Sequence, residues 1–187
     1  MATVDELIAI ARDKMDKSVE HARSEFGTVR TGRASASLLD RIEVDYYGTP
    51  TPLRQLATIN VPEPRMLTIQ PFDPSSIKSI EKAIQESDLG LTPSNDGKLI
   101  RLPIPQLTEE RRKELVKVVR NLAEEHRVAV RDIRRDTMRH LKDLVDKGDV
   151  GADEEHRGEV KVQELTDEHT RQIDELLKHK EAEVMEV

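Results

Sequence analysis

Arginine side chains are concentrated in one stretch of this 187-residue chain, and their planar groups of N–H donors are suited to binding phosphates. Residues 111–142 include 11 basic and 5 acidic side chains, a net charge of +6, although the whole chain has a net charge of −7. At about 100° per residue of helix, the basic side chains fall opposite the apolar ones. The segment therefore predicts a long helix with a basic face turned away from the core. The arginines of that face are Arg120, Arg127, Arg131, Arg134 and Arg135.

Two interpretations fit a basic helix face. The plainer one is a solvated surface that can pair with the acidic segment 153–187, which has 5 basic and 12 acidic residues. The other is binding to a defined polyanion, which is favoured because arginine outnumbers lysine and the sign of the charge alternates little along the face. With no Trp, two Tyr and two Phe, the chain has no aromatic surface for stacking bases. Contacts with the phosphates and the shape of a folded RNA are therefore expected.

No spacing in the sequence brings together residues for catalysis or for metal binding. There is no Gly-rich phosphate loop and no HExxH pair among the six histidines. The sequence EEHR occurs twice, at 124–127 and 154–157, but a histidine flanked by charges on a helix is usually exposed. We therefore expect a protein that is not an enzyme and has no cofactor and no metal site.

Three segments have the periodic apolar pattern of amphipathic helices. The first begins at a capping box formed by Thr3 and Glu6, the second spans about 108–145, and the third is the acidic C-terminal segment. Each apolar stripe is too narrow to stabilise a helix alone, so the three are expected to pack as a bundle. Two polar residues, His169 and Lys180, interrupt the stripe of the third helix.

Between the first two helices, the sequence predicts a small domain of strands and one helix. Alternating segments predict short strands, and Asp73, Pro74 and Gly90 are suited to the two ends of a helix over 73–90. The fold class is thus α+β, with a bundle of residues 1–30 and 106–187 and an inserted β/α/β domain of residues 31–105. The predicted strands are 42–48, 57–61, 66–70 and 99–102. The two connections form a candidate hinge of Thr31, Gly32, Arg33, Leu102, Pro103, Ile104 and Pro105.

The cellular context follows from composition. Cysteine is absent, so there is no disulfide framework, which is typical of a reducing compartment. The N-terminal sequence MATVDELIAIARDKMDK has charges on both sides of a short apolar run, a pattern that fits neither a signal peptide nor a spanning helix. A soluble, cytoplasmic monomer without a membrane partner is the expectation.

Five blocks of the sequence stand out: RTGRAS (30–35), YYGTPTPLRQLA (46–57), SDLGL (87–91), LTEERRKEL (107–115) and VAVRDIRRD (128–136). In this order they resemble the ribosome recycling factor family. The resemblance runs nearly end to end, with a less distinctive C-terminal third. It implies an L-shaped protein in which a three-helix bundle carries an inserted β/α/β domain and a two-stranded hinge.

The resemblance also implies a function. A member of this family binds ribosomal RNA on the large subunit after termination. With elongation factor G and GTP, it promotes splitting of the subunits and release of mRNA and deacylated tRNA. The family's RNA-contacting arginines map onto Arg112, Arg131 and Arg134, and Arg30 belongs to the RTGR block at the joint. The alternative that the residues leave open is a helical adaptor that binds protein partners through its charged helix faces.

Overall fold

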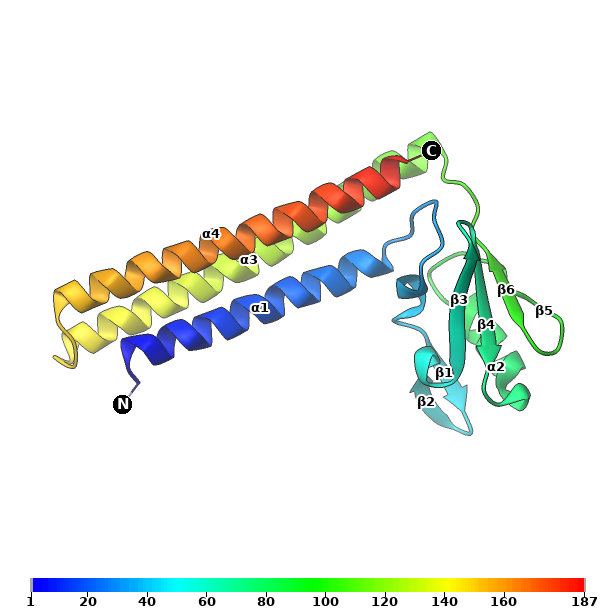
Figure 1. Ribbon diagram of the computed structural model, residues 1–187, viewed down its shortest axis with the longest axis horizontal. Helices are drawn as coiled ribbons and strands as arrows, with labels where there is room; N and C mark the ends of the chain where they lie inside the picture. Colours follow the sequence, from blue (N-terminus) through cyan, green and yellow to red (C-terminus); the bar gives the residue numbers. More distant parts are fainter. Residues whose placement is uncertain (1, 187) are drawn as a thin grey trace. The chain divides into compact units, whose positions relative to one another are not determined.

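A computed structural model describes residues 2–186 and confirms the α+β class, with three long helices and a small sheet (Figure 1). The long helices are α1 (Val4–Thr28), α3 (Glu109–Asp146) and α4 (Ala152–Met185). The predicted capping box starts α1, because the Glu6 N–H donates to Thr3 Oγ1 at 3.1 Å and the Thr3 N–H donates to Glu6 Oε2 at 3.0 Å. No helix in this described part of the chain is both long and apolar enough to cross a membrane.

The chain forms two compact units, and the three long helices contribute to both. The first unit combines α1 up to Phe26 with Lys117–Lys180. The second consists of Gly27–Val116 and the residues from Glu181 onward, so it includes the end of α1, the start of α3 and the end of α4. The predicted boundaries at residues 30/31 and 105/106 follow the loop connections instead, and they stay a prediction.

Each pair of helices in the first unit is joined by a contact between a basic and an acidic side chain. One of these contacts involves His169, which interrupts the apolar stripe of α4 and is only 1% exposed. Its Nε2 lies 2.6 Å from Asp16 Oδ1, and its Nδ1 lies 2.6 Å from the carbonyl oxygen of Leu165. The buried imidazole therefore has a hydrogen-bond partner for each ring nitrogen, and the polar residue is accommodated within the bundle. The three contacts are His126–Glu25 (α3–α1), His169–Asp16 (α4–α1) and Arg127–Asp174 (α3–α4).

A glycine allows close packing at one end of the first unit. Val4, Leu141 and Val162 belong to a buried apolar cluster contributed by all three helices. A Cβ atom added to Gly158 of α4 would lie 2.9 Å from Val4 Cγ1 and 3.2 Å from Leu141 Cδ2. Real Cβ atoms essentially never approach another atom as closely as 2.9 Å, so a side chain at this position would force Val4 or Leu141 to move.

Replacing Gly158 with Ala is expected to lower the free energy of unfolding by about 1 kcal/mol. Overpacking costs about 1–3 kcal/mol, and the better helix propensity of alanine offsets up to about 1 kcal/mol of this. Urea denaturation followed by circular dichroism measures the difference. Gly151→Ala is the control, with an expected change within about 0.5 kcal/mol, because no atom lies within 4 Å of its Cβ position. Equal stability of the two variants would contradict the packing argument.

Among the described residues, the second unit contains six strands: β1 (Glu43–Tyr46), β2 (Thr49–Pro52), β3 (Ala57–Glu63), β4 (Met66–Pro71), β5 (Ser94–Asn95) and β6 (Ile100–Pro103). Four of them form an antiparallel sheet in the order β3-β4-β6-β5, and β1 and β2 form a hairpin. Helix α2 (Ile77–Gln85) contributes three buried isoleucines to the core that includes buried residues of the sheet, and this core is separate from that of the first unit.

The inserted elements differ from the sequence-based prediction in two respects. Strands β2 and β5 were not predicted, because β2 contains two prolines and β5 has only two residues. The helix predicted over 73–90 is also shorter: Asp73 caps a 3₁₀ turn, α2 follows it, and α2 ends at Gln85. Gly90 has a φ of 65° but lies beyond that end, so the helix stops without a glycine cap.

The two tyrosines of the chain lie together at the β1–β2 turn. The Tyr46 hydroxyl donates to Asp73 Oδ2 at 3.0 Å, and the two rings meet edge to face with centroids 4.6 Å apart. Hydrogen bonds from Ser75 and Tyr46 hold the pKa of the Asp73 carboxyl below its ordinary value. Tyr47 is exposed and has a φ of 50°, an uncommon backbone conformation for a residue other than glycine.

Candidate RNA-binding face

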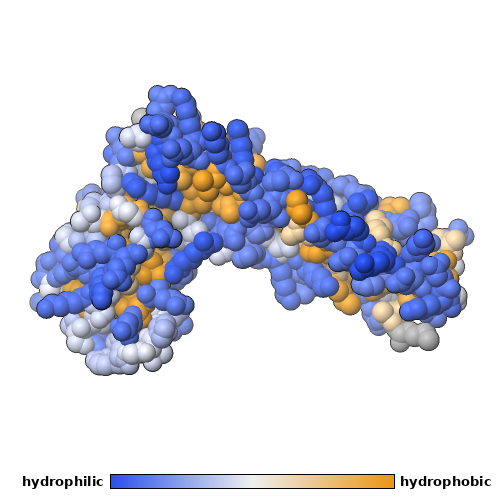
Figure 2. Space-filling view, turned by 180° about the vertical axis from the view of Figure 1, so that it is seen from behind, coloured by the Kyte–Doolittle hydropathy of each residue, from blue (hydrophilic) through white to orange (hydrophobic). Residues whose placement is uncertain are grey.

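The predicted basic face lies on α3, whose first turn is capped by Thr108. The Thr108 hydroxyl accepts a hydrogen bond from the Arg111 N–H at 3.1 Å. Figure 2 shows hydrophilic residues over most of the side of the molecule seen there, with hydrophobic residues in small patches. The predicted arginines differ in their surroundings. Arg120, Arg131 and Arg135 are exposed, whereas Arg30, Arg112, Arg127 and Arg134 are half-buried.

Arg127 is held by carboxylates of the protein. Its Nε lies 2.7 Å from Asp174 Oδ1, a second nitrogen lies 2.6 Å from the same oxygen, and a third lies 3.2 Å from Glu124 Oε2. The side chain is only 20% exposed. Three of its donors are therefore engaged, and its position between α3 and α4 suits a structural contact better than a contact with RNA.

Arg131 and Arg135 form weaker, solvent-exposed ion pairs within the protein. Arg131 contacts Glu124 at 3.0 Å and Arg135 contacts Asp132 at 2.6 Å, with all four side chains about half exposed or more. Hydrogen bonds from Arg131 and Arg127 hold the pKa of Glu124 below its ordinary value. Because exposed pairs of this kind contribute about 0.2–1 kcal/mol, an incoming phosphate can replace such a carboxylate at little cost.

The guanidinium groups of Arg112 and Arg134 have no hydrogen-bond or ion-pair partner among residues 2–186, and in each the Nε is buried. Leaving a buried donor unsatisfied costs about 1–3 kcal/mol, and an arginine cannot avoid that cost by losing its proton. Arg112 also lines a small pocket of the second unit with Arg33 and Arg65. These two guanidinium groups are thus the strongest candidates for binding an acceptor from outside the chain.

Arg30 is the fourth candidate that the resemblance selected. One of its terminal nitrogens donates to the carbonyl oxygen of Pro105 at 3.3 Å, and its Nε is buried without a partner. Desolvation and the nearby Arg111 lower the pKa of this guanidinium. The Arg30 guanidinium therefore already joins the segment after α1 to the segment after β6 through its hydrogen bond to Pro105.

The residues of the candidate hinge are more firmly held than their Gly and Pro content suggests. Leu102 and Pro103 belong to β6 and pair with β4, and Ile104 is buried, with its N–H donating to the Arg65 carbonyl oxygen at 2.8 Å. Thr31 is buried as well, and its hydroxyl accepts from the Arg33 N–H. Gly32 has open space around it. That these connections act as a hinge stays a prediction.

A helix wheel does not reveal which arginines are paired. The contact between Arg127 and Asp174 joins residues 47 positions apart, and the sequence has no signal for it. In contrast, the pairs Glu124–Arg127 and Asp132–Arg135 are three residues apart and are legible in the sequence, so the face alternates in sign more than expected. Arg33 and Arg65 of the small pocket were not predicted as binding residues.

The fold and the arginines of α3 together define a class of protein. Its members combine a bundle of long helices, one of which presents basic side chains, with a small inserted domain of strands and one helix. The family model described as "Ribosome recycling factor" matches residues 22–185, and the chain belongs to the ribosome recycling factor family. A ribosome-recycling factor of Rubrobacter xylanophilus is 55% identical over 95% of each chain. That of Desulforamulus reducens is 56% identical over 98% of this chain and 100% of its own length.

Solved structures show the same likeness. A solution structure of a ribosome recycling factor matches with a TM-score of 0.80 and 39% identity, covering 100% of both chains. A second match has a TM-score of 0.71 and 46% identity and covers 99% of this chain and 100% of the other. Its description gives models for the Thermus thermophilus recycling factor and Escherichia coli elongation factor G bound to the E. coli post-termination complex.

Proposed function

We propose that this chain binds the large subunit of the post-termination ribosome and, together with elongation factor G and GTP, promotes splitting of the subunits. Release of mRNA and deacylated tRNA follows from that splitting. The proposal is supported by family membership and by a related structure that is described as bound to a post-termination complex with elongation factor G. In this scheme GTP is hydrolysed on elongation factor G, and the chain itself carries out no chemical step.

One structural observation supports the RNA contact in particular. Arg112 and Arg134, which the family resemblance selects, are the predicted arginines whose side chains have neither a hydrogen bond nor an ion pair among the described residues. Both lie on α3, and an exposed neighbour, Arg131, contacts the half-exposed Glu124. Phosphate oxygens supply the acceptors that these groups lack, and an arginine can bind two of them at once.

The charge distribution favours an RNA contact on the helices rather than on the inserted residues 34–102. Residues 34–102 have 7 basic and 9 acidic side chains, a net charge of −2, and no basic face. The RNA is therefore proposed to be held mainly by α3, which leaves the inserted unit available for the protein partner.

Two measurements with the full-length protein test this function. The chain is expected to sediment with purified large subunits, whereas a helical adaptor for other proteins would stay in the supernatant. In a light-scattering assay, it is expected to split post-termination ribosomes only when elongation factor G and GTP are both added. Splitting without elongation factor G, or no sedimentation with the large subunit, would contradict the proposal.

A further inference from the structure

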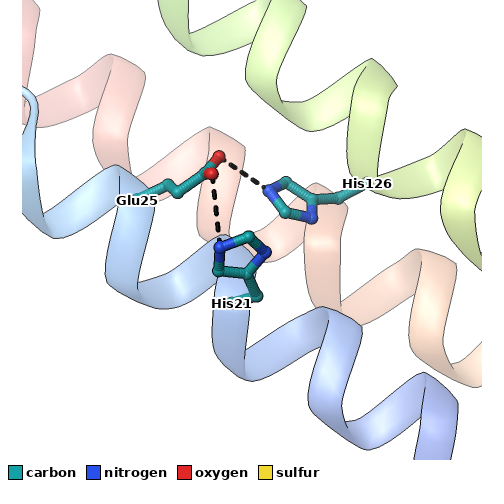
Figure 3. Close-up of side chains that lie close together, drawn as sticks. All are labelled: His21, Glu25 and His126. Atoms are coloured by element: carbon teal, nitrogen blue, oxygen red, sulfur yellow. Dashed lines mark hydrogen bonds and ion pairs between the residues drawn. The ribbon is translucent and has the colours of Figure 1, made fainter.

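Three metal-ligating side chains meet between α1 and α3 in the first unit (Figure 3). Nε2 of His126 lies 2.9 Å from Oε2 of Glu25, and Nε2 of His21 lies 3.4 Å from Oε1 of the same carboxylate. The two imidazole rings meet edge to face with centroids 5.3 Å apart. One carboxylate therefore lies between two imidazole nitrogens, and one donor atom from each residue lies within 4.8 Å of the others.

We propose that His21, Glu25 and His126 form a binding site for a transition-metal ion of the zinc type. Two imidazoles and one carboxylate are a donor set that zinc uses in proteins, with a fourth position left for water. In a tetrahedral site with bonds of about 2.0–2.1 Å, neighbouring donor atoms are about 3.3 Å apart. The separations of 2.9 and 3.4 Å involve the two different oxygens of Glu25, and one donor atom from each of the three residues lies within 4.8 Å of the others. The side chains would therefore close by up to about 1.5 Å around a bound ion.

The surroundings provide both rigidity and access. His21 and Glu25 are four residues apart, so they lie on one face of α1, and His126 approaches from α3. The side chains of His126 and Glu25 are 8% and 19% exposed, which restricts their movement. That of His21 is 69% exposed, which leaves a path for the ion and for a water ligand. A bound ion would link the two helices and stabilise the folded chain, because the site is assembled only on folding.

Two other histidines show that this arrangement is not a general property of the charged helices. His169 has both ring nitrogens beside protein oxygens, those of Asp16 and Leu165, so neither is open to an ion. His156 belongs to the second EEHR sequence and lies 3.8 Å from Glu159, but no third donor joins that pair among residues 2–186. The site therefore depends on His126 meeting a pair from another helix.

The test uses the full-length protein, freed of metal with a chelator and titrated with ZnCl2 at neutral pH in a calorimeter. One zinc ion per chain is expected to bind, and the thermal unfolding temperature is expected to rise with zinc. His21→Ala removes an exposed ligand without disturbing the core, and it should weaken zinc binding by at least about tenfold. His126→Ala is less suitable, because it leaves the half-buried Glu25 carboxylate without this partner.

His156→Ala is the matched control, since it removes an exposed histidine from a helical His–Glu pair that has no third donor. It should keep the zinc affinity and the zinc-dependent rise in unfolding temperature of the wild type. MgCl2 should raise the unfolding temperature of none of the three proteins, because Mg²⁺ prefers octahedral oxygen ligands. Zinc affinity in the wild type no greater than that in His21→Ala would overturn the proposal.

Discussion

Replacing Arg134 with Ala is expected to weaken binding to the large ribosomal subunit by about tenfold or more without lowering the free energy of unfolding. The loss follows because a hydrogen bond to a charged group contributes about 1.5–3 kcal/mol. Stability is retained because the guanidinium has no partner among residues 2–186, and its buried, unsatisfied Nε destabilises the free protein. Sedimentation with purified subunits over a range of concentrations, and urea denaturation, measure the two quantities.

Arg127→Ala is the matched control, because it removes the same group from the same helix. Its guanidinium already binds Asp174 and Glu124, so this variant is expected to lose about 1 kcal/mol of stability and to keep most of its affinity for the subunit. The reverse pattern, with lost affinity in Arg127→Ala and lost stability in Arg134→Ala, would contradict the assignment of the two arginines.

The salt dependence of binding separates a phosphate contact from a loss of shape. Each phosphate neutralised by the protein releases counterions, so binding weakens as salt increases. Affinity of the Arg134→Ala variant should therefore fall less steeply with salt than that of the wild type. An unchanged slope together with weaker binding would show that Arg134 acts through packing instead.

The second large effect is expected in the core of the second unit. Ile80 of α2 is fully buried within the cluster that joins the helix to the sheet. Replacing it with Ala should reduce the stability of this unit by about 3 kcal/mol, because lost burial and the resulting cavity both contribute. Amide hydrogen exchange of β4 and β6 measures the effect, with an expected acceleration of about a hundredfold where exchange requires opening of the unit.

Phe72→Ala in the same unit provides the comparison. This variant removes a larger side chain, but Phe72 is 66% exposed, so the expected loss is only about 0.5 kcal/mol or less. A greater loss of stability in Phe72→Ala than in Ile80→Ala would contradict this expectation, because it would mean that the aromatic ring belongs to the core. The pair thus tests whether burial, rather than side-chain size, determines stability here.

The long helices were predictable because their signals are local and repeat many times. The capping box of Thr3 and Glu6 and the apolar period of three and four residues are evident in the sequence, and α3 (Glu109–Asp146) lies within one residue of the predicted 108–145 at each end. Val118 is an exception: its position on the wheel is apolar, but it is 43% exposed, because partner helices do not cover every part of a stripe.

The binding residues were less predictable, since their roles depend on residues distant in the sequence. Both Arg127 and Arg134 lie on the basic side of a helical wheel. The contact of Arg127 with Glu124 is local, but its contact with Asp174 of α4 has no signal in the sequence. The meeting of His126 with Glu25 spans 101 positions for the same reason. Contacts of this kind follow from how helices are rotated against each other, which a single periodic pattern does not specify.

The pairing of Tyr46 with Tyr47 at one turn has a practical consequence for spectroscopy. The chain has no Trp and no other Tyr, so its tyrosine fluorescence arises from the second unit alone. Far-ultraviolet circular dichroism is dominated by α1, α3 and α4, most of whose length belongs to the first unit. A single denaturation with both detectors therefore shows, without any label, whether the two units unfold together or one after the other.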